Sequence, residues 1–240
     1  MLEALKSGTP LLRVYVADNC KRDGVLEDIE RKARQRNVPV QQVPRKKLDA
    51  MGQANIHQGV IAEAKPFTYA SLEDVIAAAE AYADAHDGRA LIVILDHITD
   101  AGNLGAIARS AESIGASGII IPNKRAAQVT AATFKASAGA IVHIPVARVA
   151  NLSQAISKLQ DANIWIVAAT EHSAKPIWDI NLKGTMAIVM GSESDGVSRL
   201  IEECCDFSAC LPMQGNVESL NVAQAATVFF YEWLRQNTAG

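Results

Sequence analysis

The sequence contains few cysteines, no long apolar run and none of the common nucleotide-binding signatures. No apolar run reaches the roughly 18 residues that a membrane-spanning helix needs. The start, MLEALKSGTP, lacks the charged-then-apolar layout of a signal peptide. Of the 240 residues, 49% are hydrophobic and 20% are charged. This composition predicts a globular, cytoplasmic protein with one large domain or two small ones.

Metal-ligand patterns are also missing. The cysteines, which show no CxxC or Cys/His ligand spacing, are Cys20, Cys204, Cys205 and Cys210. The five histidines have no such spacing either. We therefore expect reduced thiols and no metal site. A lone histidine such as His97 or His143 is expected to have a structural role.

Phosphate-binding and hydrolase signatures are absent too. The loop after the predicted strand 90–96 reads DHITDAGNLGAIARS, without the GxGxxG spacing of a dinucleotide site. Neither GxxxxGK followed by Ser or Thr, nor GxSxG, occurs. The sequence therefore disfavours a Rossmann dehydrogenase, a phosphate-loop hydrolase and an α/β-hydrolase.

The net charge of −3 hides an asymmetry along the chain. Residues 1–66 carry 12 lysines and arginines against 8 aspartates and glutamates, a net charge of +4. Residues 67–240 carry 11 against 18, a net charge of −7. The basic segment at 1–66, joined to an acidic segment at 67–240, suggests that residues 1–66 bind a polyanion, although a solvated basic surface would give the same pattern.

Residues 1–66 predict a small α/β domain. LLRVYVA (11–17) alternates and is β-branched, as strands do, and residues 24–37 place their apolar side chains on one helical face. A strand at 38–43, a short helix from Arg45 and a strand within 57–64 follow. Residues 67–88 predict a linker and a helix, which Ser71 caps with Asp74 at the third position.

Residues 89–240 predict an open, mostly parallel α/β sheet. Continuous apolar runs such as ALIVILD (90–96) and GIIIP (118–122) are typical of buried parallel strands, and helical patterns alternate with them. We expect a loop at 102–105 to lead into a helix at 106–114. SAGAIVHIPV (137–146) is expected to be a strand.

Ligands of such sheets bind at the carboxyl ends of the strands. Polar residues gather at the predicted strand ends, at 100–103, 170–171, 191–193 and 215–221. The last group belongs to LPMQGNVESLN (211–221), which opens an apolar helix at 221–235. This stretch alone leaves two interpretations open, a ligand site at a helix N-terminus or plain capping by Ser219.

Three stretches together resemble the SpoU/TrmH family of the SPOUT superfamily. They are DHITDAGNLGAIARSAESIGASGIII (96–121), IVMGSESDGVSRLIEE (188–203) and LPMQGNVESLNVAQAATVFFYEWLR (211–235), in the family's order and spacing. KASAGAIVHIPV (135–146) resembles the stretch between them. Family members are RNA ribose 2′-O-methyltransferases that use S-adenosylmethionine. Residues 1–66 resemble the substrate-binding domain fused to many members, which is similar in shape to RNA-binding ribosomal proteins.

The resemblance implies a deep trefoil knot at the C-terminus of the α/β domain at 89–240. Threaded chains are rare, and periodicity alone would not predict one. The resemblance further implies that backbone groups of Gly191, Leu211 and Leu220 hold S-adenosylmethionine, and that Thr170 and Met213 line its adenosine pocket.

The resemblance also implies a reaction site without a metal. Arg109 would bind the substrate phosphate and the ribose hydroxyl and accept its proton, a role in which an arginine, normally protonated, needs help. Asn103 would orient Arg109 or the ribose, and Glu193 would fix the active-site loop. Ser219 and Asn221 would hold the nucleotide and the knot. The plain alternatives are a surface cation, a turn residue and helix caps.

The sequence departs from the family in three places. Ala101 stands where the family usually has proline, and Ser194 stands where its second motif often has glycine. A serine at 194 would be costly if the position needed a positive φ. Relatives usually carry a few more residues before MLEAL, which implies a missing first strand or turn, or a start that lies upstream.

The resulting hypothesis is S-adenosylmethionine-dependent methylation of a ribose 2′-hydroxyl in structured RNA, most specifically a guanosine of 23S rRNA. A homodimer is implied, and the helices at 106–114 and 222–234 are candidates for its interface. In the domain at residues 1–66, the residues expected to contact RNA are Arg13, Arg45, Lys46, Lys47, His57 and Gln58. The alternatives are a tRNA methyltransferase of the same family and a non-catalytic RNA-binding or ribosome assembly factor.

Overall fold

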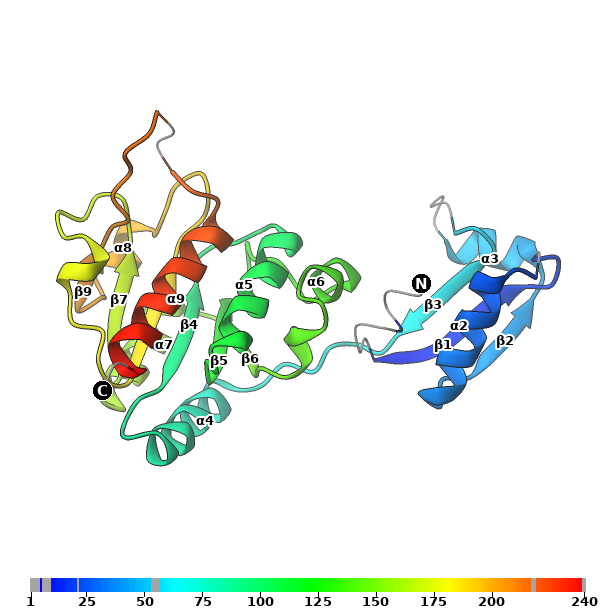
Figure 1. Ribbon diagram of the computed structural model, residues 1–240, viewed down its shortest axis with the longest axis horizontal. Helices are drawn as coiled ribbons and strands as arrows, with labels where there is room; N and C mark the ends of the chain where they lie inside the picture. Colours follow the sequence, from blue (N-terminus) through cyan, green and yellow to red (C-terminus); the bar gives the residue numbers. More distant parts are fainter. Residues whose placement is uncertain (1–4, 6–9, 21, 53–56, 217–218, 239–240) are drawn as a thin grey trace. The chain divides into compact units, whose positions relative to one another are not determined.

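The structure is a computed structural model, and it describes residues 5, 10–20, 22–52, 57–216 and 219–238. The chain divides into two compact units, Met1–Phe67 and Thr68–Gly240, which Figure 1 traces in sequence order. Among the described residues, no helix has the length and apolar character needed to cross a membrane.

The first unit is a three-stranded sheet with a helix on each face. Its elements are β1 (Leu11–Ala17), α2 (Gly24–Gln35), β2 (Val40–Val43), α3 (Arg45–Met51) and β3 (Val60–Ala64). The central β1 runs parallel to β2 and antiparallel to β3. Because side chains alternate along a strand, Val14 and Val16 pack with α2, whereas Tyr15 and Ala17 pack with Leu48 of α3.

The second unit is built on a six-stranded sheet, and its elements follow in chain order. They are α4 (Leu72–Ala85), β4 (Leu91–Leu95), α5 (Ala101–Ser113), β5 (Gly118–Pro122), α6 (Ala131–Ala136), η1 (Ala140–Val142), β6 (Val146–Val149), α7 (Leu152–Asp161), β7 (Trp165–Ala169), η2 (Ile177–Asp179), β8 (Met186–Met190), α8 (Arg199–Glu202), β9 (Phe207–Ala209) and α9 (Val222–Thr238). The strands lie in the order β6-β5-β4-β8-β7-β9, and every pairing is parallel. This confirms the expected open α/β sheet.

Helices cover both faces of this sheet. Apolar side chains of α4 and α7 pack on alternate strand residues such as Ile94 and Val189. The residues between them, such as Val93 and Ile188, are also buried and point to the other face. On that face α5 and α9 lie side by side (Figure 1) and are joined by a Ser110–Thr227 hydroxyl contact of 2.7 Å.

The predicted cap of α4 is confirmed. The Ser71 amide donates to the Asp74 carboxylate at 2.8 Å, and the Asp74 amide donates to Ser71 Oγ at 3.0 Å. Hydrogen bonding of the Asp74 carboxylate to the side chain and the backbone amide of Ser71 lowers the pKa of Asp74. The pair therefore satisfies amides of the first turn that have no partner within the helix.

Helix α5 begins at Ala101, so the loop predicted at 102–105 is wrong. Asp100 caps the helix by accepting a hydrogen bond from the Asn103 amide at 2.7 Å. Gly105 serves close packing instead of a turn, since a Cβ there would lie 2.6 Å from the Ala136 Cβ and 2.7 Å from the Thr133 carbonyl oxygen. Ala101 is the first helical residue, a position that also suits the family's proline.

The strand predicted at 137–146 is wrong over most of its length. Helix α6 ends in a turn at Gly139, whose φ of 92° is left-handed, and residues 140–142 form the short helix η1. Strand β6 begins only at Val146, after Pro145. A glycine that reverses the chain outweighs the β-branched pattern of the residues after it.

The end of α9 is fastened to the loop before β8. The Gly184 amide donates to Asn237 Oδ1 at 2.9 Å, and Trp233 Nε1 donates to the Gly184 carbonyl oxygen at 3.2 Å. Gln236 Oε1 accepts a hydrogen bond from the Leu182 amide at 2.8 Å. These contacts anchor the C-terminal end of α9 beside the start of β8. They therefore orient the helix, so that its first turn lies toward the end of β8.

We predict that Gly105→Ala lowers the free energy of unfolding by about 1–3 kcal/mol, because the new methyl group forces α5 and α6 apart. The matched control is Gly24→Ala, at the first position of α2, where a Cβ would meet nothing within 4 Å. That change should leave stability unchanged or raise it slightly. Urea unfolding followed by circular dichroism measures both, and equal stability of Gly105→Ala and the wild type would contradict the packing argument.

Candidate functional site

A pocket of about 300 Å³ opens at the carboxyl edge of the second sheet. The ends of β7, β8 and β9 contribute to it, together with the segment before α9. The lining residues are Ala169, Thr170, Glu171, His172, Met190, Gly191, Ser192, Glu193, Ser194, Gly196, Ala209, Cys210, Leu211, Met213, Ser219, Leu220, Val222, Ala225 and Phe229. Three of the four polar groups predicted to meet at this edge line the pocket, and the fourth joins them through Asn103, which donates a hydrogen bond to Glu193.

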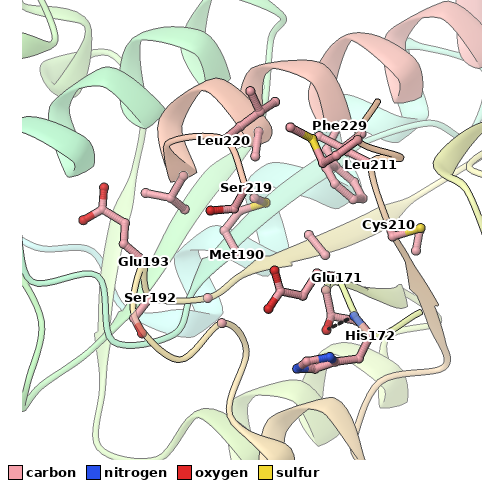
Figure 2. Close-up of a pocket in the computed structure, with 18 of the residues that line it drawn as sticks. Glu171, His172, Met190, Ser192, Glu193, Cys210, Leu211, Ser219, Leu220 and Phe229 are labelled. Atoms are coloured by element: carbon pink, nitrogen blue, oxygen red, sulfur yellow. Dashed lines mark hydrogen bonds between the residues drawn. The ribbon is translucent and has the colours of Figure 1, made fainter. Parts of the chain in front are cut away.

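The pocket has an apolar side and a polar side. Figure 2 shows Leu211, Leu220 and Phe229 gathered on one side, with Glu171 and His172 on the opposite side. The described lining residues include no lysine or arginine. The five residues predicted to contact a cofactor all belong to this lining, and they are Thr170, Gly191, Leu211, Met213 and Leu220.

A tight loop at 192–196 forms one wall of the pocket. Ser192 and Gly196 exchange backbone hydrogen bonds of 3.0 Å in each direction. The chain returns so closely that a Cβ on Gly191 would lie 1.9 Å from the Gly196 carbonyl carbon and 2.0 Å from the Val197 nitrogen. The positive φ of this loop, 66°, falls on Gly196, so Ser194 occupies its position without that backbone cost.

Three of the predicted reaction-site residues form one hydrogen-bonded cluster. Glu193 Oε1 accepts from Asn103 Nδ2 at 2.6 Å and from Asn221 Nδ2 at 2.7 Å. Asn221 Nδ2 also lies 3.1 Å from Asn103 Oδ1, and Asn221 Oδ1 accepts from the Ala223 amide at 3.0 Å. The cluster therefore ties together the first turn of α5, the 192–196 loop and the start of α9.

The other two predicted reaction-site residues make no hydrogen bond to this cluster. Ser219 lines the pocket but is absent from the hydrogen bonds just described. Arg109 lies on α5, six residues beyond Asn103, so roughly 9 Å along the helix axis and on a different face. Its side chain is exposed and makes no hydrogen bond or ion pair within the described part of the chain. The structure therefore leaves the Arg109 guanidinium free to bind another molecule.

The residues predicted to bind RNA lie on α3, on strand β1 and in the loop before β3. The first turn of α3 exposes Arg45, Lys46 and Lys47. Arg13 lies on the face of β1 that α3 covers, and it donates to Gln41 at 2.9 Å. The His57 ring instead ties its own loop, because Nε2 lies 2.9 Å from Asp49 and Nδ1 accepts from the Gly59 amide at 3.0 Å.

The exposed Gln58 beside it has a φ of 49°, so the 57–59 turn presents Gln58 to solvent while His57 holds the turn in place. Both residues stay predictions as RNA contacts.

Sequence analysis missed several residues of the pocket, notably His172, Cys210 and Phe229. His172 directly follows the polar pair recognised at 170–171, so extending that cluster by one residue would have found it. Phe229 looks like an ordinary core residue of an apolar helix, and it carries no sequence signal. All four cysteines are half-buried, and at Cys205 partial burial, followed by the neighbouring Cys204, raises the pKa of the thiol to about 12. Among the described residues, no cluster of His, Cys, Asp and Glu could hold a metal ion.

Two family models match the chain, one for each unit. Residues 90–231 match the SpoU rRNA Methylase family, and residues 1–70 match the family described as RNA 2′-O ribose methyltransferase substrate binding. Together the two matches include the pocket, the hydrogen-bonded cluster and the basic face of α3.

Curated relatives match over nearly the whole length. The TrmH family protein YacO of Bacillus subtilis, named for tRNA/rRNA methyl transfer, is 41% identical over 238 residues, which cover 98% of this chain and 92% of YacO. A TrmH family protein of Staphylococcus haemolyticus with the same naming is 37% identical, covering 98% of this chain and 92% of its own.

Solved structures share the fold of both units. An rRNA methyltransferase from Sinorhizobium meliloti, crystallised with AdoMet bound, is 26% identical with a TM-score of 0.70, over 99% of this chain and 84% of that one. The SpoU methyltransferase AviRb from Streptomyces viridochromogenes, also in complex with AdoMet, gives a TM-score of 0.74 at 23% identity, over 99% and 87% of the two chains. At that identity the second likeness shows the fold alone.

We predict that Asn221→Asp destabilises the chain in a pH-dependent way. The new carboxylate replaces an amide that donates to Glu193 at 2.7 Å, so like charges raise the pKa of one carboxyl group in the folded state. The penalty is present above that raised pKa and is relieved as the pH falls through it. The loss of stability, about 1–3 kcal/mol at pH 8, should therefore shrink at pH 5.

Two further variants control this measurement by thermal unfolding. Asn221→Ala loses the same hydrogen bonds without adding a charge, so its stability loss should not depend on pH. Adding Glu193→Gln to Asn221→Asp removes the repulsion and should recover most of the loss. A loss with Asn221→Asp that is identical at both pH values would show that the cluster does not hold these two side chains together.

Proposed function

The chain belongs to the SpoU rRNA methylase family, and from that premise we propose that it transfers the methyl group of S-adenosylmethionine to the ribose 2′-hydroxyl of a guanosine in 23S rRNA. The family membership supports the coarser statement, that of an RNA methyltransferase of the TrmH/SpoU type. The observation that carries the proposal is the Asn103–Glu193–Asn221 cluster at the edge of a pocket suited to the cofactor.

The pocket fits S-adenosylmethionine in size and in charge. Its volume of about 300 Å³ is within the range of small-molecule pockets. The cofactor carries a sulfonium and an ammonium against a single carboxylate, so it is a net cation. Carboxylates of Glu171 and Glu193 belong to the lining, and the described lining offers no competing cation. Leu211, Leu220 and Phe229 give an apolar wall for an adenine ring (Figure 2).

The backbone near Gly191 supports the same assignment. A side chain at this position would collide with the returning chain at Gly196 and Val197, so only a glycine lets the two segments approach. We propose that backbone groups of Gly191, Leu211 and Leu220 hold the cofactor, and that Thr170 and Met213 line its adenosine. In this proposal the segments 191–196 and 211–221 belong to a trefoil knot through which the C-terminal part of the chain passes.

The reaction requires an oriented nucleophile and a route for its proton. When bound, S-adenosylmethionine supplies a methyl group activated by its sulfonium. A ribose hydroxyl attacks in line only if the chain holds it in place and its proton is removed. We propose that the Asn103–Glu193–Asn221 cluster fixes the loop and orients the ribose, with Ser219 beside it. Arg109, which has no hydrogen-bond or ion-pair partner in the described part of the chain, binds the substrate phosphate and the hydroxyl and accepts the hydroxyl proton, with help from that phosphate because an arginine is normally protonated.

The first unit supplies RNA affinity in this proposal. Exposed cations gather on α3, at Arg45, Lys46 and Lys47, and Arg13 lies on the same sheet face. Such cations bind phosphates regardless of sequence. The presence of this fused unit favours ribosomal RNA over tRNA as the substrate. The chain would act in the cytoplasm as a homodimer through α5 and α9, where Val228 and Tyr231 leave 44% and 53% of their surfaces exposed.

The substrate is tested by mapping ribose methylation in a strain that lacks the gene. The proposal expects one guanosine of 23S rRNA to lose its 2′-O-methyl group, and purified protein with labelled S-adenosylmethionine to restore it. A missing methyl group in tRNA would redirect the assignment to the tRNA enzymes of the same family. If calorimetry detected no binding of S-adenosylmethionine, a non-catalytic RNA-binding or assembly role would take its place.

We predict that Arg109→Ala reduces the rate of methyl transfer by about 100-fold or more, because the hydroxyl loses the group that orients it. The affinity for S-adenosylmethionine should be unchanged, since Arg109 is not part of the pocket lining. Arg199→Ala, which removes another exposed arginine, on α8, is the matched control and should retain activity. Full transfer by Arg109→Ala would refute the role of Arg109.

We predict that reversing three charges on α3, with Arg45→Glu, Lys46→Glu and Lys47→Glu, lowers the affinity for rRNA by about tenfold or more at 0.1 M salt. The matched control reverses three charges on α2, with Arg31→Glu, Lys32→Glu and Arg34→Glu, on the opposite sheet face of the same unit. Filter binding measures both. An equal loss for the two triple variants would indicate an effect of net charge alone, not of a binding face on α3.

A further inference from the structure

A second cavity, of about 620 Å³, lies on the other side of the 192–196 loop from the first pocket. It is lined by Asp96, His97, Ile98, Thr99, Arg125, Ser192, Glu193, Ser194, Asp195, Gly196 and Ser198. Four of these residues, Ser192, Glu193, Ser194 and Gly196, line both cavities. The loop that carries Glu193 is therefore shared by the proposed cofactor pocket and this second cavity.

The second cavity contains an oriented histidine. Asp96 is buried, with 1% of its surface exposed, and its Oδ2 accepts a hydrogen bond from the Ser198 amide at 2.8 Å. Its Oδ1 lies 2.5 Å from His97 Nδ1. Because a carboxylate can only accept, Nδ1 carries a proton, so in the neutral ring Nε2 is the acceptor. No described residue donates a hydrogen bond to His97 Nε2, although 42% of the side chain is exposed.

Two residues that line this cavity have an uncommon backbone conformation. His97 has a φ of 60° and Arg125 a φ of 54°. Bulky residues adopt positive φ at a cost, and such residues gather at binding sites where the surrounding structure enforces them. The other non-glycine residues with positive φ in the described chain, Asn37, Gln58, Asp87, Ala138 and Asn163, do not line this cavity.

The charges of the lining limit what the cavity can bind. Its carboxylates are Asp96, Glu193 and Asp195, and Arg125 is the one arginine or lysine of the described lining. Asp96 and Glu193 already accept hydrogen bonds from amides, and Asp195 accepts one from the Ser194 hydroxyl at 2.6 Å. A row of phosphates would be repelled. A ligand with O–H or N–H donors and a single phosphate would match these acceptors and Arg125.

We infer that this cavity receives the nucleotide to be methylated, with Arg125 binding its phosphate and His97 Nε2 accepting a hydrogen bond from its sugar or base. The inference rests on the proposed function and names the substrate site of that same reaction. A nucleotide splayed out of folded RNA offers those donors with one phosphate at hand. In this position the nucleotide would lie against Glu193, which lines both cavities, so that its ribose extends past the 192–196 loop to the cofactor pocket, with a neighbouring phosphate of the same RNA left for Arg109.

Arg125→Ala tests the phosphate contact, and Lys124→Ala is its matched control. Both side chains are exposed, and each substitution removes one positive charge, but Lys124 does not line the cavity. Arg125→Ala should raise the KM for the accepting rRNA by about tenfold, as expected for a lost charge-assisted hydrogen bond. The Kd for S-adenosylmethionine should stay at the wild-type value. Equal KM values for the two variants would overturn the assignment of Arg125.

His97→Gly and His97→Asn test the histidine separately from folding. Glycine adopts a φ of 60° without strain, which offsets part of the lost hydrogen bond to Asp96, so His97→Gly should stay folded at the assay temperature and still raise KM for RNA or lower kcat by about tenfold. Asparagine tolerates this backbone and keeps an acceptor, so His97→Asn should recover part of the activity. Asn163→Gly, at a φ of 59° directly after the C-terminal cap of α7 and outside both cavities, is the control for the glycine change.

The outcomes separate this inference from the proposed function. If the wild-type protein methylated no RNA from the deletion strain, the proposed function itself would fail. If the wild type methylated rRNA and the Arg125 and His97 variants matched its KM and kcat, only the assignment of this cavity would fall. A fall in unfolding temperature or in S-adenosylmethionine affinity that accounted for the lost activity would show that both residues act on the fold instead.

Discussion

The parallel pairing of β4, β8, β7 and β9 is the constraint on which the site depends. Because these neighbouring strands run the same way, the segments that follow them emerge at one edge of the sheet. Gly191 then permits the tight return at 196–197, which places Glu193 opposite the first turn of α5. Asn221 closes the arrangement by donating to Glu193 from the start of α9. The hydrogen-bonded cluster therefore depends on the shared direction of these strands and on the tight return that Gly191 permits.

Sequence patterns predicted the fold well where burial is uniform and poorly where packing overrules local preference. The apolar runs at 90–96 and 118–122 became fully buried strands, because a strand covered on both faces has no polar side to reveal. Gly105 was misjudged as a loop residue, since the approach of α6 that requires a glycine inside α5 involves residues about 30 positions away. The turn at Gly139 likewise depends on a left-handed φ that the alternating pattern conceals.

The sequence predicted which residues belong to the candidate site, but not the hydrogen bonds among them. Resemblance to a family named Asn103, Glu193 and Asn221, but the hydrogen bonds among them join positions 28, 90 and 118 residues apart. No local pattern encodes such contacts. His97 was expected to be structural, and half of that expectation holds because Asp96 fixes one ring nitrogen. The exposure of the other nitrogen to a cavity follows from the backbone conformation at that residue, which composition and periodicity do not report.

The place of Asn221 in the chain has a consequence for synthesis. The first turn of α5 leaves the ribosome 118 residues before Asn221 does, a delay of roughly 6–24 s at translation rates of about 5–20 residues per second. During that interval Glu193 lacks one of its donors, and the pocket lacks the wall formed by Leu211, Leu220 and Phe229. The pocket is therefore complete only after the last helix, α9, has docked. A truncation before that helix would also remove Phe229, Phe230 and Trp233, which are among the largest fully buried side chains of the described chain.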